Sequence, residues 1–197
     1  MRKGEATRTR IVEEAARQAA LRGLAAVSLG DVAQAVGLSK SGLFKHFESK
    51  EAMELAVVEH VTQWFTDFTW RPAADLPTAR ERLARVFELW LDWEDREWAQ
   101  GGCPIMAFSV EVDDQPGPVR DLLQKRLRQW KTTLVRQFQQ LREPPLSDAE
   151  AQSAYFQMKS FALGHLDARR IMGEADARRS AQAAFDALLD RTARAAA

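Results

Sequence analysis

The sequence has one cysteine among 197 residues and no long apolar run. A single cysteine excludes an intramolecular disulfide and is typical of proteins from a reducing compartment. No stretch approaches the roughly 20 apolar residues that cross a bilayer, and residues 1–10 lack the apolar core of a secretory signal. We therefore expect a cytoplasmic protein without a membrane span.

The motifs of enzymes and of metal or cofactor sites are also missing. The sequence holds no G-x-S-x-G, no Walker loop, no dinucleotide fingerprint and no H-E-x-x-H. The three histidines are His46, His60 and His165. They show metal-ligand spacing neither with one another nor with Cys103. We expect no catalytic residue, no metal and no cofactor; an all-α enzyme that uses Glu111 is the competing interpretation.

The formal net charge is zero, but the charge is unevenly distributed. Residues 1–50 hold nine cationic and five anionic side chains, whereas the remainder holds 19 and 23. A basic end on an acidic body is typical of a DNA-binding head joined to a part that does not bind DNA. The first four cations, Arg2, Lys3, Arg8 and Arg10, either reach the minor groove or flanking phosphates, or belong to a solvated tail.

Residues 28–50 carry the most informative pattern, which is two short helices joined by a glycine turn. Ser28 and Ser39 are good N-caps, and Gly37 can adopt the positive φ that ends a helix. Small and cationic residues remain on the outer face of the second helix, namely Lys40, Ser41, Gly42 and Lys45. Such a face suits contact with base edges and phosphates. A helical subdomain without a role in DNA binding is the alternative.

Residues 7–53 resemble the N-terminal domain of TetR/AcrR-type repressors, through the runs SLGDVAQAVGLS and FKHFESK. Pattern and resemblance together predict these DNA-contact residues: Ser28, Ser39, Lys40, Ser41, Gly42, Phe44, Lys45, His46 and Lys50. The resemblance implies that Lys50 meets backbone phosphate. Phe44 stands where the family usually has tyrosine, and Lys45 where it usually has an aromatic residue. Gly30 offers no side chain where many relatives have a polar contact.

The rest of the chain is predicted to be helical, so that the fold class is all-α with about nine helices. The first helix is predicted to start at Thr7 or Thr9, and the segment 71–77 is predicted to be a break. Helices in the body are expected over 50–68, 78–93, 103–112, 119–141, 147–172 and 176–195. We expect a helix-turn-helix domain over 1–48 and an effector-binding and dimerisation domain over 49–197.

All six tryptophans lie between Trp64 and Trp130. The family resemblance places an effector pocket among the central helices, and the residues predicted to line it are Trp64, Phe68, Trp90, Trp93, Phe108, Trp130, Phe161 and His165. Such a lining favours a flat or hydrophobic small molecule, whereas ordinary core packing is the alternative for each residue. Residues 101–120 resemble a recurrent C-terminal subtype of these regulators, which does not define the ligand.

The last two helices, over about 147–195, have broad apolar faces. The resemblance implies that they pair with a second copy as a four-helix bundle, and a twofold dimer reads a palindrome. An intramolecular helical hairpin is the alternative.

The sequence thus predicts a homodimeric transcriptional regulator, a repressor that a small molecule releases from a palindromic DNA operator. One alternative is a protein of this fold that binds ligands without binding DNA. Another is a redox sensor through Cys103, which follows two glycines at a predicted helix start, where the thiolate is favoured. Glu111, Asp113 and Asp114 form either a carboxylate cluster or, as we expect, a solvated turn.

Overall fold

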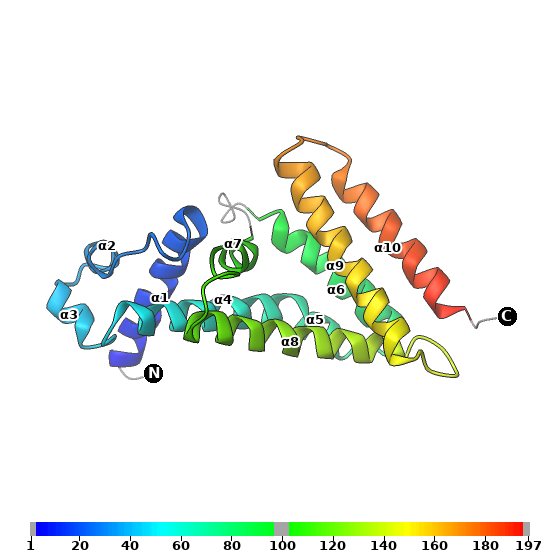
Figure 1. Cartoon of the computed structure of the whole chain (residues 1–197), viewed down its shortest axis with the longest axis horizontal. Coiled ribbons are helices and arrows are strands. Elements are labelled where there is room, and N and C mark those ends of the chain that lie inside the picture. The colour runs from blue at the N-terminus through cyan, green and yellow to red at the C-terminus, as the bar shows by residue number, and fades with distance from the viewer. Residues whose placement is uncertain (1–2, 97–102, 195–197) are drawn as a thin grey trace. The chain divides into compact units, whose positions relative to one another are not determined.

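The computed structural model describes residues 3–96 and 103–194, and every regular element in these ranges is a helix (Figure 1). The described residues form no strand, which confirms the all-α fold. Nine helices and a single-turn segment, α5, agree with the expected number. The elements are α1 (Lys3–Arg22), α2 (Leu29–Ala35), α3 (Lys40–Phe44), α4 (Lys50–Thr69), α5 (Arg71–Ala74), α6 (Ala79–Glu94), α7 (Pro104–Glu111), α8 (Pro118–Gln139), α9 (Asp148–Arg170) and α10 (Ala177–Ala193). None of these helices has both the length and the apolar character that a bilayer span requires.

The chain divides into two compact units. Unit 1 comprises Met1–Trp64 and Arg96–Arg126, and unit 2 comprises Phe65–Asp95 and Leu127–Ala197. The boundaries fall inside α4 and α8, so each of these helices contributes residues to both units. The domain division at residue 48 stays a prediction.

Unit 1 has a core built from α1, α2 and α3, in which Ile11, Ala15, Val32 and Leu43 are fully buried. The predicted start of α1 at Thr7 or Thr9 is wrong, because α1 begins at Lys3. Thr9 is not an N-cap, since its hydroxyl donates to the carbonyl of Glu5 at 3.0 Å, inside the helix. An acidic residue in the first turn suits a helix start at this earlier position.

In unit 2, the segment after Thr69 is not the simple break that was expected. Pro72 stands at the beginning of α5, where a helix tolerates a residue without an N–H. At the start of α9, Ser147 and Glu150 form a capping box, in which each side chain accepts a hydrogen bond from the other residue's backbone amide. Thr78 and Glu81 form the same arrangement at the start of α6. The starts of α6 and α9 are thus specified by contacts over three residues.

The helices α9 and α10 run side by side in opposite directions (Figure 1). The buried side of this hairpin packs on α6, where the rings of Phe87 and Phe185 stack with centroids 4.1 Å apart. Many apolar residues of these two helices are buried within the chain, namely Tyr155, Met158, Ala162, Ala181, Phe185 and Leu188. Phe156, by contrast, is 69% exposed on α9.

Candidate DNA interface and effector site

The helices α2 and α3 are fixed by the caps that the sequence predicts. The hydroxyl of Ser28 accepts a hydrogen bond from the amide of Asp31 at 3.0 Å, and Ser39 does the same for Gly42 at 3.0 Å. Gly37 adopts a φ of 71° in the turn between them. Because both helix starts are satisfied locally, the two helices keep a defined orientation.

The predicted DNA-contact residues lie on the outer side of this unit. Exposed side chains belong to Ser28, Ser39, Lys40, Ser41, Phe44 and Lys45, and partly exposed residues are Gly42, His46 and Lys50. Phe44 is 42% exposed, which is a large apolar area for an end of a short helix. This surface, which we call the reading face, offers hydroxyl, ammonium and aromatic groups for contact.

Ser39 and Gly42 have a structural part in the reading face. The Ser39 hydroxyl lies 3.0 Å from that of Ser41 in addition to capping α3. A Cβ on residue 42 would lie 3.2 Å from the Ser39 hydroxyl, so glycine allows the close approach. Lys40 and Lys45 remain the cations that project from this helix.

Two arginines of α1 contact the helix-turn-helix core. The guanidinium of Arg8 lies 4.6 Å from the ring centroid of Phe47, a cation–π arrangement. Arg10 donates to the carbonyl of Val36, at the C-terminal end of α2, at 3.1 Å. Neither arginine lies in a tail, whereas Arg2 and the side chain of Lys3 fall outside the described residues.

Glu111 does not lie in a solvated turn, and this expectation was wrong. Its carboxylate accepts hydrogen bonds from the backbone amides of Leu24, at 2.6 Å, and Ala25. On the other side of the same turn, the ammonium of Lys50 donates to the carbonyl of Ala25 and lies 3.4 Å from Glu54. No local pattern could have found the Glu111 contact, because its partners are more than 80 residues away.

The predicted effector residues are divided between the units. Trp64 and Phe108 belong to unit 1, and the other six belong to unit 2. In unit 2, Trp90, Trp93 and Trp130 surround the ring of Phe65 edge-on, with centroid distances of 5.5, 5.2 and 5.1 Å. We call these four residues the aromatic cluster. Phe68 extends it, 5.9 Å from Trp93. The prediction missed Phe65, although it is one residue from Trp64.

Polar groups accompany the aromatic cluster. Glu94, which is 1% exposed, accepts a hydrogen bond from the indole Nε1 of Trp90 at 3.2 Å. The Nε1 of Trp130 is buried and has no acceptor among the residues that the structure describes. A buried donor without a partner costs about 1–3 kcal/mol, so this atom marks a place where a ligand could supply an acceptor.

His165 is placed by an ion-pair cluster. Its Nε2 lies 3.0 Å from a carboxylate oxygen of Asp95, which also accepts from Arg169 and, at 2.9 Å, from Arg178. Arg178 additionally bonds Asp92 at 2.7 Å. Burial raises the pKa of the Asp95 carboxyl, but the hydrogen bonds from Arg178 and His165 outweigh burial, and the pKa is lowered. Phe161, one turn before His165, is half-buried.

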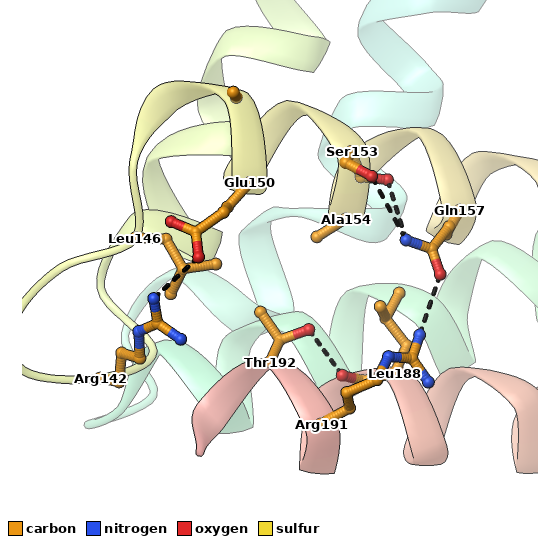
Figure 2. A pocket seen from close by; sticks show the side chains of 10 residues that line it. Arg142, Leu146, Glu150, Ser153, Ala154, Gln157, Leu188, Arg191 and Thr192 are labelled. Carbon is orange, nitrogen blue, oxygen red and sulfur yellow. Dashed lines mark hydrogen bonds and ion pairs between the residues drawn. The ribbon is translucent and has the colours of Figure 1, made fainter. Parts of the chain in front are cut away.

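A surface groove of about 410 Å³ lies where α9, α10 and the segment before α9 meet (Figure 2). Its apolar residues include Leu146, Ala154 and Leu188. On its sides Arg142 bonds Glu150, and Arg191 bonds Gln157, both at 2.9 Å. The predicted effector residues do not line this groove, and its arginines are already bonded to neighbouring side chains.

Cys103 is 5% exposed and precedes α7 as its N-cap. This burial favours a packing residue over an accessible sensor thiol. The two glycines before it lie outside the described residues. Within the part of the chain that the structure describes, no group of three His, Cys, Asp or Glu side chains could hold a metal ion.

A capped helix-turn-helix with an exposed cationic face defines a DNA-binding protein of the all-α class. Residues 11–57 match the family model for bacterial regulatory proteins of the tetR family. Residues 79–185, more than half of the chain, match the tetracyclin repressor-like C-terminal domain. The chain therefore belongs to the TetR family of DNA-binding transcription regulators.

Solved structures share this fold. A TetR transcriptional regulator from Cytophaga hutchinsonii is 25% identical, with a TM-score of 0.75 over 98% of this chain and 96% of that one. A TetR regulator from Chloroflexus aurantiacus J-10-fl is 23% identical, with a TM-score of 0.78 over 98% and 95%. AibR, solved with isovaleryl coenzyme A and operator DNA, is 19% identical, with a TM-score of 0.71 over 94% and 97%. No curated protein sequence matched the chain.

Proposed function

We propose that this protein is a cytoplasmic, homodimeric repressor that a small molecule releases from a palindromic operator. The observation that carries the proposal is the reading face, on which Lys40 and Ser41 of α3 and its C-cap residue Lys45 are exposed, and the N-cap of α3 is satisfied. Base edges and phosphates are the partners that such groups suit. AibR, which has this fold, was solved with operator DNA and isovaleryl coenzyme A, and this supports DNA and a small molecule as the two partners proposed here.

The dimer is proposed to form through the outer sides of α9 and α10. Phe156 is a large apolar residue left exposed on α9. Ala183 and Ala187 are exposed four residues apart on α10, where small side chains allow a second helix to approach closely. An added Cβ at Gly164 would meet nothing within 4 Å, so the helix surface is open there too. A dimer would bring two short recognition helices to one palindrome.

The effector is proposed to bind at the aromatic cluster. The indole Nε1 of Trp130 supports this assignment, because a bound acceptor would satisfy it. Helix α4 carries Phe65 of the cluster and Lys50 of the reading face. A shift of α4 on effector binding would change the separation of the two helix-turn-helix domains in the dimer. Operator affinity would then fall by a coupling free energy of about 1–3 kcal/mol.

Selection of genomic fragments on the purified full chain tests DNA binding, and we expect enrichment of a palindromic sequence. An operator shift assay with candidate small molecules then tests release. Failure to retain any fragment would favour a ligand-binding protein without DNA binding. Unchanged affinity under a saturating ligand would exclude that ligand as an effector.

Replacement of Lys50 by alanine is expected to weaken binding to all DNA sequences alike. If its ammonium meets phosphate, the slope of log K against log salt becomes shallower by about one. Fluorescence anisotropy at several salt concentrations measures this slope. Lys125→Ala, which removes an exposed cation from α8, is the matched control and should leave the slope unchanged. An unchanged slope in Lys50→Ala would contradict the phosphate assignment.

Replacement of Trp130 by phenylalanine keeps an aromatic ring and removes only the indole donor. We expect about tenfold weaker binding of the effector, which is the factor for a loss of about 1.4 kcal/mol, and unchanged operator affinity without effector. Titration by calorimetry with a molecule that released DNA in the shift assay measures the effect. Trp70→Phe removes an indole donor outside the aromatic cluster and should bind as the wild type does. Equal affinity in both variants would place the effector elsewhere.

A further inference from the structure

The turn between α1 and α2 is held from two sides. The Glu111 carboxylate accepts from the amides of Leu24 and Ala25, so both oxygens are used. The carbonyl of Ala25 accepts from Lys50 at the start of α4. These hydrogen bonds involve charged groups, which makes each of them stronger than a neutral one. The position of the turn is therefore set by α7 and α4 as well as by its own residues.

The turn is also shaped to receive this carboxylate. Gly23 has a φ of 85°, and a Cβ there would lie 3.3 Å from the Glu111 carboxylate. Glycine thus supplies both the backbone conformation and the room for Glu111. The side chain of Leu24 is buried, at 3% exposed, which anchors the turn in the core of unit 1.

A second contact joins the same part of the chain to the DNA-binding side. The guanidinium of Arg126 in α8 forms two hydrogen bonds to the carboxylate of Glu59 in α4, one of them at 2.8 Å. The segment 104–126, which includes α7 and the start of α8, is therefore bonded both to the α1–α2 turn and to α4. All of these residues belong to unit 1.

We propose that Glu111 is a positioning residue for operator binding, which fixes the helix-turn-helix to α7 through the α1–α2 turn. Glu111 itself does not lie on the reading face, and both of its carboxylate oxygens are bonded to the turn. Its effect is on orientation within unit 1: with the contact intact, the helix-turn-helix keeps one orientation relative to α7. Without the contact, each head samples more orientations, and simultaneous binding to two half-sites loses entropy. This inference rests on the proposed dimeric DNA binding.

The test compares wild type, Glu111→Gln and Glu111→Ala on the selected palindrome and on a duplex that holds one half-site. We expect about tenfold weaker binding of both variants to the palindrome, which lies within the range of measured couplings. Binding to the half-site is expected to stay unchanged, because the reading face is intact. Hydrogen exchange of the free full chain should show lost protection at the amides of Leu24 and Ala25, with helix content by circular dichroism preserved.

Asp114→Asn is the matched control, since it neutralises an exposed carboxylate three residues from Glu111 and should behave as the wild type. Equal binding of variants and wild type to the palindrome would overturn the positioning role alone. Equal losses on palindrome and half-site would also overturn it, because they would indicate general destabilisation of the head. If the wild type binds neither DNA, the proposed function fails, and this inference fails with it.

Discussion

Phe156→Glu is expected to convert the protein to monomers and to weaken binding to a palindromic operator by about a hundredfold or more. Phe156 is 69% exposed on α9, and a dimer through this helix would bury its ring. A carboxylate at that position would have to lose its water without gaining a partner, which interfaces tolerate poorly. Sedimentation equilibrium measures the mass, and fluorescence anisotropy with the operator measures the affinity.

A second exposed apolar residue provides the control for this substitution. Val110 is 68% exposed, nearly the same fraction as Phe156, but it lies on α7. Val110→Glu should therefore leave the mass of the dimer unchanged. A dimer that persists in Phe156→Glu with unaltered operator affinity would show that the interface lies outside this face of α9.

The starts of α2, α3 and α9 could be predicted from the sequence because the interactions that define them are local. Ser28 and Ser39 each bond an amide three residues later, so the pattern and the contact lie in the same short stretch. The same reason applies to the capping box of Ser147 and Glu150. The helix-turn-helix, which consists of such caps and one glycine turn, was therefore predictable almost completely.

The contacts that join distant helices could not be predicted in this way. Glu111 is the last residue of the apolar helix α7, and two aspartates follow it after Val112, which is the pattern of a solvated turn. Its partners, Leu24 and Ala25, lie 87 and 86 residues away and contribute only backbone amides. Because every residue except proline has a backbone N–H, the residue types at positions 24 and 25 do not indicate that these amides bind a carboxylate.

The candidate effector site could be predicted from the sequence only in part. Residue type and the family resemblance together suggested a set of aromatic side chains, and Trp90, Trp93 and Trp130 all contact Phe65. Aromatic content does not specify which ring lies at the centre, and Phe65 was missed for this reason. Trp64, its neighbour, is 37% exposed in the other compact unit, because adjacent positions on a helix point about 100° apart.

Asp95→Asn is expected to lower the free energy of unfolding by about 2–3 kcal/mol, since it weakens several charge-assisted hydrogen bonds. Asp95 follows α6 and joins it to His165 and Arg169 of α9 and to Arg178 of α10. The loss would also leave the buried His165 ring without its carboxylate. Urea denaturation at pH 7 measures the change. Asp92→Asn, which removes only one bond to Arg178, is the control and should cost less.

The pH dependence of the free energy of unfolding distinguishes the effect of the Asp95 charge from the effect of side-chain packing at this position. Because hydrogen bonds hold the pKa of Asp95 below its ordinary value despite burial, the folded state binds this proton less readily than the unfolded state. The stabilisation is therefore complete above the ordinary pKa of about 4 and is lost as the pH falls through the lower pKa of the folded state. The difference in stability between wild type and Asp95→Asn should shrink as the pH falls below about 4. A difference that stays constant down to pH 3 would mean that packing, and not the carboxylate charge, joins the end of α6 to the α9–α10 hairpin.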